Sequence, residues 1–153
     1  LRSLLKNSND PVKGVESLIK DKIELEKKVA VLVAEKAKVL KTELLQSVIE
    51  INGVNFIGAL VDLEPASMKE LSFACKKELD NLVMVLGAIN NGKANLSVAV
   101  SNDLTERLNA GAIIREISKE IQGGGGGQVF FATAGGKNPE GLKDAFEKAK
   151  TFL

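Results

Sequence analysis

Five consecutive glycines, 123 to 127, are the residues of this chain whose type and spacing best suit a binding site. Glycine leaves backbone N–H groups unshielded and permits positive φ angles, so a glycine loop can close around an anion such as phosphate. A second glycine pair follows after a short apolar segment and precedes a lysine. The alternatives are a flexible linker and an ordinary solvated lysine. The candidate contacts are Gly123, Gly124, Gly125, Gly126, Gly127, Gln128, Gly135, Gly136, Lys137 and Asn138.

The glycine run differs from the two common nucleotide-binding loops. A P-loop needs Lys-Ser or Lys-Thr after its glycines, and a dinucleotide fingerprint follows a strand. Here Gln128 follows the glycines, and the segment before them has helical spacing. Neither loop type is therefore predicted.

Catalytic and metal-binding side chains are scarce. The chain has no histidine and a single cysteine, Cys75, which excludes the common zinc sites, histidine-based relays and an internal disulfide. Cys75 lies in the helical pattern MKELSFACKKEL, which favours a buried thiol over a nucleophile. We expect no catalytic residue, no metal and no cofactor in this chain, and a cytoplasmic location.

Composition places the chain among globular proteins, with 44% hydrophobic and 27% charged residues. Its net charge of +1 gives little electrostatic support to nucleic-acid binding. No apolar segment approaches the roughly 18 to 20 residues of a membrane span, so no membrane partner is expected. The chain begins with Leu instead of Met, which favours a piece of a larger protein.

A long helix is predicted from Asp10-Pro11 onward, with Asp as the N-cap and Pro at the first helical position. Residues at helical spacing form an apolar seam that Glu26 interrupts. Packing on neighbouring domains, a homodimeric coiled coil, and the segment Leu1–Lys6 folding back are the alternatives for covering it. The seam residues are Ile19, Ile23, Ala30, Val33, Ala37, Leu40 and Leu44.

The remaining pattern predicts an α+β fold, a long N-terminal helix followed by a mixed sheet of about five strands with helices packed on it. Asn52-Gly53 joins two β-rich runs, as in a two-residue hairpin. We expect a helical subdomain over 1–47 and a globular subdomain over 48–153. The expected elements after the hairpin are a helix over 64–79, strands at 82–89 and 96–101 joined by a turn at 90–93, a helix over 104–121, a strand at 129–132 and a helix from Asn138-Pro139.

Further contacts are expected from the helix before the glycines. Arg115 and Lys119 are candidates for binding nucleic acid, and Arg107 shares a face with Arg115 if the helix is continuous, although both arginines could simply be solvated. Phe130 and Phe131 could stack on unpaired bases, but in a strand at least one ring should point into the core.

Four segments in one order resemble the C-terminal domain of bacterial alanyl-tRNA synthetases. They are Ala99-Val-Ser-Asn-Asp-Leu104, Asn109-Ala-Gly-Ala-Ile-Ile-Arg-Glu-Ile117, the glycine run, and Ala132-Thr-Ala-Gly-Gly-Lys-Asn-Pro139. The resemblance extends over essentially the whole chain. A related module occurs behind the catalytic half of DHH-superfamily phosphoesterases, whose Asp/His metal motifs this chain lacks.

The resemblance implies a non-catalytic part of an alanine-tRNA ligase. It would contact the outer corner of the tRNA and help bring the aminoacylation and editing domains onto one tRNA. Its partners would be alanine tRNA and the other domains of the synthetase, while ATP, magnesium and an editing-site zinc would belong to the whole enzyme. Two alternatives remain: the substrate-binding half of a phosphoesterase, and a dimerisation module.

Two positions depart from that family. Gln128 replaces a frequent Arg or Lys, and Thr133 replaces the usual Gln, so a charged phosphate contact from this loop is not expected. We further predict that Gly125→Asp leaves the fold intact and weakens tRNA binding.

Overall fold

The structure, a computed structural model, describes residues 10–153, and contacts divide the chain into two compact units. One unit ends at Leu40 and the other is Lys41–Leu153. The segment Leu1–Lys6, considered above as a cover for the apolar seam, lies outside the described residues. Within 10–153, no helix is both long and apolar enough to cross a membrane.

Helix α1, Pro11–Gln46, begins where the sequence predicts. The carboxylate of Asp10 accepts a hydrogen bond from the Val12 N–H at 3.0 Å, which satisfies one of the free donors of the first turn. At the other end, the Ser47 N–H donates to Glu43 and Leu44, and Leu44 is buried in the second unit. The predicted long N-terminal helix is confirmed, whereas the domain boundary at 47/48 stays a prediction.

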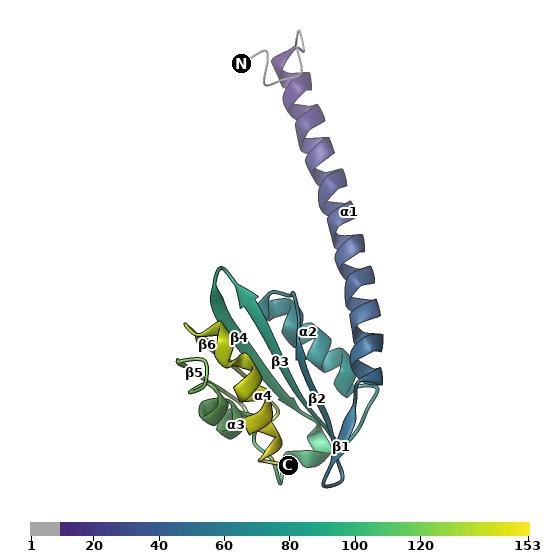
Figure 1. The fold of residues 1–153 in the computed structure, drawn as a ribbon. Helices are drawn as coiled ribbons and strands as arrows, with labels where there is room; N and C mark the ends of the chain where they lie inside the picture. The colour runs from purple at the N-terminus through teal and green to yellow at the C-terminus, as the bar shows by residue number, and fades with distance from the viewer. Residues whose placement is uncertain (1–9) are drawn as a thin grey trace. The chain divides into compact units, whose positions relative to one another are not determined.

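The second unit contains one mixed sheet of six strands, in the order β1-β2-β3-β4-β6-β5 (Figure 1). Strands β2 and β3 are parallel and the other neighbours are antiparallel. The α+β class with a mixed sheet is confirmed, with one strand more than expected. The strands are β1 (Ile49–Ile51), β2 (Val54–Leu60), β3 (Leu82–Asn90), β4 (Lys93–Val100), β5 (Gly123–Gly127) and β6 (Phe131–Gly136).

Two tight hairpins follow directly from turn residues. Asn52 and Gly53 have φ of 51° and 79° between β1 and β2, and Asn91 and Gly92 have 51° and 72° between β3 and β4. Two successive positive φ angles define the turn whose twist suits a two-residue hairpin, and Asn-Gly is its preferred sequence. Both predicted turns are confirmed.

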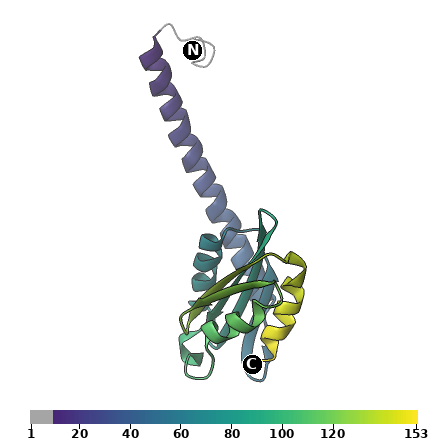
Figure 2. The same cartoon turned by 90° about the vertical axis from the view of Figure 1, so that its left-hand side faces the viewer.

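Three helices cover the two faces of the sheet (Figures 1 and 2). Helix α2 lies on β3 and β4, while α3 and α4 lie on the opposite face, α3 against β4, β6 and β5. These helices are α2 (Pro65–Lys76), α3 (Ala110–Ile117) and α4 (Leu142–Lys150), with short 3-10 turns η1 (Asn102–Leu104) and η2 (Pro139–Gly141).

Alternation along the central strands explains this layering. Successive side chains of a strand point to opposite faces. Val83 and Val85 of β3 join the core cluster of α3 and α4, which includes Ile114. Met84 is equally buried and faces α2. Because β3 is buried on both faces, its sequence is a nearly continuous apolar run, and the strand expected at 82–89 is confirmed.

Two expected elements are wrong in extent. The helix expected over 104–121 is only α3, because Leu104 ends η1 and the Asn109 side chain caps α3 by accepting from the Ala112 N–H at 3.1 Å. Arg107 therefore lies in a turn and shares no helix face with Arg115. The strand expected at 129–132 begins at Phe131.

Candidate nucleic-acid interface

The glycine run is the edge strand β5. It pairs antiparallel with β6, so that Gly123 faces Gly136 and Gly124 faces Gly135. Neither a flexible linker nor a closed anion loop describes it, since the backbone is extended and bonded to a neighbouring strand. As the last strand of the sheet, β5 leaves its outer backbone groups without a strand partner.

The alternating positions of β5 differ in whether the fold requires glycine there. A Cβ on Gly123 would lie 2.0 Å from the Gly135 carbonyl oxygen, and one on Gly125 would lie 2.3 Å from the Thr133 oxygen. A Cβ on Gly127 would lie 2.5 Å from the Phe131 oxygen. These three positions require glycine because β6 approaches so closely. The prediction that Gly125→Asp would leave the fold intact is therefore wrong.

Gly124 and Gly126 are different, because a Cβ there would meet nothing within 4 Å. Neither residue has a positive φ. Glycine inside a strand costs roughly 0.5–1 kcal/mol relative to alanine, and no close neighbour in this fold requires it at these two positions. Close approach of another molecule's backbone is one physical reason for glycine inside a strand.

These two glycines and their partners Gly135 and Thr133 form a surface without large side chains, called here the glycine shelf. Gly124, Thr133 and Gly135 are exposed. The shelf is on the α2 face of the sheet, but α2 lies over β3 and β4 and leaves β6 and β5 open. A chain of sugars and phosphates could thus lie along the shelf beside α2.

A hollow of about 300 Å³ lies at one end of the shelf, next to Gly124 and Gly135. Its walls include Pro65 and Met68, from the start of α2, and Asn95 and Ser97 of β4. The Ser97 hydroxyl is buried and has no hydrogen-bond partner within residues 10–153. This end of the shelf is therefore polar and close to the positive end of the α2 dipole.

A second hollow, of about 200 Å³, borders Gly126. Lys69, Phe73, Phe130 and Phe131 line it and, with the neighbouring Lys76, form a group called here the aromatic–lysine cluster, in which α2 meets the turn between β5 and β6. Neither Phe130 nor Phe131 enters the core: Phe130 is 37% exposed and Phe131 is half-buried, which corrects the expectation that one ring would point inward. The cluster consists of Lys69, Phe73, Lys76, Phe130 and Phe131.

Three of these residues were not among the sequence candidates. Lys69, Phe73 and Lys76 are spaced by four and three residues, so they share one face of α2. That spacing was readable in the sequence. What the sequence could not supply is that this face borders the shelf, because the contact joins segments more than 50 residues apart.

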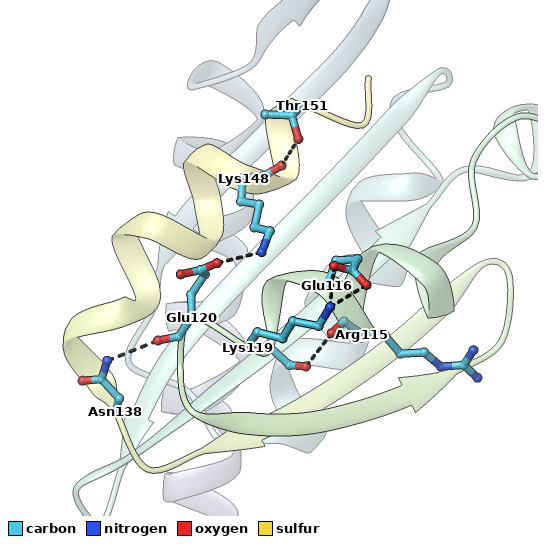
Figure 3. A network of polar contacts seen from close by, with 8 residues as sticks. Arg115, Glu116, Lys119, Glu120, Asn138, Lys148 and Thr151 are labelled. Atoms are coloured by element: carbon cyan, nitrogen blue, oxygen red, sulfur yellow. Dashed lines mark hydrogen bonds and ion pairs between the residues drawn. The ribbon is translucent and has the colours of Figure 1, made fainter.

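Other predicted contacts lie away from the shelf, on the α3 and α4 side of the sheet (Figure 3). Lys119 donates to both carboxylate oxygens of Glu116 at 2.9 and 2.7 Å. Asn138 donates from its side chain to the Glu120 carbonyl at 3.2 Å, and Lys148 binds the Glu120 carboxylate at 2.7 Å. The network ties the end of α3 to η2 and α4.

Electrostatics in this network are those of ordinary ion pairs. The hydrogen bond from Lys119 lowers the pKa of Glu116, and the hydrogen bond to Glu120 raises the pKa of Lys148. In Figure 3 the Arg115 side chain extends away from these pairs. Lys119 and Asn138 thus already have partners inside the chain, and Arg115 is exposed.

The remaining candidates, Gln128 and Lys137, are exposed at opposite ends of the β5–β6 hairpin. The structure therefore brings Gln128 together with the glycines at the turn, and Lys137 with Gly123 and Gly136 at the open end. Across residues 10–153, no group of three or more Cys, Asp or Glu side chains is placed to hold a metal ion.

Helix α1 carries a wide apolar surface within the first unit. Ile19, Ile23 and Val33 of the predicted seam are 54%, 46% and 49% exposed. Leu18 and Leu25, which the seam did not include, are 39% and 61% exposed and widen the apolar face. Within residues 10–153, these side chains are therefore exposed.

Comparison with known proteins identifies a family and several relatives of this chain. Residues 53–153 match the DHHA1 domain family. The chain is 50% identical to the alanine–tRNA ligase of Christiangramia forsetii and 40% identical to that of Cytophaga hutchinsonii, in both cases over its whole length. It spans only 18% of the length of either relative.

Solved structures agree with this match. The C-Ala domain of Aquifex aeolicus alanyl-tRNA synthetase has a TM-score of 0.67 and 25% identity, covering 70% of this chain and 97% of that one. A DHH-domain protein, described as a member of the s1p family of ribosomal proteins, has a TM-score of 0.51 at 15% identity and shares the fold alone. The resemblance inferred from the four sequence segments is confirmed.

Proposed function

This chain belongs to the DHHA1 domain family, and from that premise we propose that it is the non-catalytic, tRNA-binding C-terminal domain of an alanine–tRNA ligase. In this role it contacts the outer corner of the tRNA and helps present one tRNA to the aminoacylation and editing domains. It would work in the cytoplasm as part of translation. Its partners are alanine tRNA and the other domains of the synthetase.

The observation that carries the proposal is the open glycine shelf. Gly124 and Gly126 are glycines that no close neighbour in the fold requires, in an edge strand where glycine is unfavourable. An RNA backbone could approach the strand only if side chains were absent at these two positions. Because net charge is only +1, affinity would depend on such local contacts and on avidity from sister domains.

Catalytic cofactors are assigned to the rest of the enzyme. We propose that ATP, magnesium and the editing-site zinc bind other domains, and for the metals this agrees with the lack of a ligand cluster within residues 10–153. The rival function, the substrate-binding half of a DHH-type phosphoesterase, has support from a shared fold alone. Hydrolysis of an oligonucleotide by this chain with Mn²⁺ would favour that rival.

A titration tests the proposal. The chain is added to fluorescently labelled alanine tRNA, a non-cognate tRNA and single-stranded DNA of matching length, each at two salt concentrations. We expect tighter binding to both tRNAs than to DNA, weakening as salt rises, because the shared tRNA shape is read through its backbone. Equal binding to DNA, or none to tRNA, would contradict the proposal.

Self-association through α1 is a second candidate function, favoured by its exposed apolar face. Leu25 and Val29 are 61% and 58% exposed and border an apolar groove with Leu18 and Val33. A homodimer would bury them. Sedimentation of the chain beside Leu25→Glu tests this: a dimer that the substitution dissociates is expected, and a monomer in both samples would rule it out.

A further inference from the structure

Three aromatic rings meet at the end of the glycine shelf. The Phe73 ring of α2 lies edge-on to Phe130, with centroids 6.2 Å apart, and is tilted against Phe131 at 5.6 Å. Aromatic rings at these separations attract each other through their quadrupoles. The contact fixes Phe130, the most exposed of the three rings, against a helix.

Two lysines flank the rings. Lys76 places its Nζ 5.1 Å from the Phe73 centroid and 5.4 Å from that of Phe130, and Lys69 lies 5.9 Å from Phe131. Within the described part of the chain, neither ammonium group forms an ion pair, unlike Lys119, whose carboxylate partner is Glu116. Lys76 also donates to the Phe130 carbonyl at 3.5 Å, and neither positive charge is neutralised by an ion pair that would exclude an anionic ligand.

Partial burial of Lys76 bears on its interaction with such a ligand. Desolvation lowers the pKa of Lys76, with Asp103 opposing that shift. A partly desolvated ammonium interacts more strongly with an anion than a fully hydrated one, because less water screens it.

The turn that carries Phe130 is held on both sides by backbone hydrogen bonds. The Val100 N–H donates to the Phe130 carbonyl at 3.0 Å, and the Ala110 N–H donates to the Val129 carbonyl at 2.8 Å. Within the turn, the Gln128 N–H donates to Phe131 at 2.8 Å. The exposed ring is thus presented on an ordered backbone, which reduces the entropy lost on binding.

We propose that the aromatic–lysine cluster binds one unpaired base of an RNA, stacked on Phe130, with Lys69 and Lys76 contacting the phosphates beside it. This inference rests on the proposed function and adds a defined subsite to it. Stacking would use the part of Phe130 that stays exposed, 37% of the residue, beside Lys76 and Phe73. The neighbouring shelf lets the RNA backbone continue past Gly126, whose missing side chain borders the same hollow.

Nucleic acid suits this site better than an apolar peptide. An apolar peptide would leave two ammonium groups without a partner, whereas a nucleotide supplies both a planar apolar face and a negative charge. Bases that are unpaired, as in RNA loops, can be stacked on aromatic side chains in this way, while bases inside a duplex cannot.

The chain contains neither tryptophan nor tyrosine, which gives a direct optical test. Phe130→Trp places a single indole at the stacking position, and Phe152→Trp places one against the core cluster on the α3 and α4 face of the sheet as a control. We expect alanine tRNA to quench the fluorescence at position 130 and leave position 152 unchanged. A fully paired RNA duplex with closed ends should quench neither, and equal quenching at both positions would contradict stacking.

The affinities of substituted chains for alanine tRNA distinguish stacking on Phe130 from a simple apolar contact. Phe130→Ala should weaken alanine-tRNA binding by roughly 5- to 150-fold, the range measured when a stacking aromatic is removed, and Phe130→Leu should lose nearly as much. Lys69→Met and Lys76→Met should each lower the slope of log affinity against log salt by about one, whereas Phe130→Ala should not. The control Lys143→Ala removes an exposed charge from α4, away from the cluster.

The outcomes distinguish this inference from the proposed function. Full affinity in Phe130→Ala or Phe130→Leu, in a chain that binds tRNA and whose fold is verified by circular dichroism, overturns stacking and leaves the function intact. Absence of tRNA binding by the unmodified chain overturns both.

Discussion

Gly125 of β5 pairs with Ala134 of β6 so closely that a Cβ on Gly125 would lie 2.4 Å from the Ala134 Cβ. One residue further along β5, Gly126 has no such neighbour. Five identical residues therefore fall into two groups, one required by strand packing and one open to an outside partner.

The effect of Gly→Ala substitution on the free energy of unfolding should differ between these two groups of glycines. Gly125→Ala should lower the free energy of unfolding by about 1–3 kcal/mol, because β5 must shift away from β6. Gly124→Ala and Gly126→Ala should leave it unchanged or raise it by up to about 1 kcal/mol, because alanine loses less entropy on folding. Urea unfolding of the three variants measures this, and equal losses at all three positions would contradict the packing described here.

Sequence reasoning succeeded where the cause of structure is local. The turns at Asn52-Gly53 and at 90–93 were predicted because Asn and Gly readily adopt the positive φ angles that a two-residue hairpin needs. The strand at 82–89 was predicted because this segment is a continuous apolar run, the pattern of a strand buried on both faces. In each case the responsible residues are neighbours in the chain.

Strand β5 was missed because its cause is not local. Glycine has no side chain to alternate and is rare in strands, so Gly123–Gly127 has the pattern of a loop. It is a strand because it pairs with β6, whose backbone approaches so closely that Gly123, Gly125 and Gly127 have no room for a Cβ. The aromatic–lysine cluster was missed for the same reason, since Phe73 and Phe130 meet only in the folded chain.

Asn138 should contribute to stability more than to binding. Its side chain donates to Glu120 at 3.2 Å and its backbone N–H donates to Ile121 at 2.9 Å, joining the segments before β5 and after β6. Asn138→Ala should lower the free energy of unfolding by about 1 kcal/mol, because one hydrogen bond is lost. Thermal unfolding and tRNA titration on the same sample test this. Weaker tRNA binding with unchanged stability would instead make Asn138 an RNA contact.

Cys75 should be unreactive in the folded chain. Its side chain is fully buried, and desolvation raises the pKa of its thiol to about 11 despite nearby Lys41. The nucleophile is the thiolate, which is scarce at pH 8 for such a thiol. A thiol reagent should react slowly at pH 8 and rapidly after urea is added. Immediate reaction in the native state would show that α2 opens readily from the sheet.

The central claim is that RNA approaches the glycine shelf, and one titration tests it most directly. The double variant Gly124→Asp, Gly126→Asp adds two carboxylates at positions with open space. The control variant Lys143→Ala, Lys93→Ala makes the same change in net charge at two exposed positions outside the shelf. Both folds are checked by circular dichroism.

We predict that the shelf variant binds alanine tRNA at least about tenfold more weakly than the control, because a like charge facing phosphate costs on the order of several kcal/mol. Equal affinity of the two variants for alanine tRNA would contradict the claim, and would mean that RNA binds elsewhere on the chain.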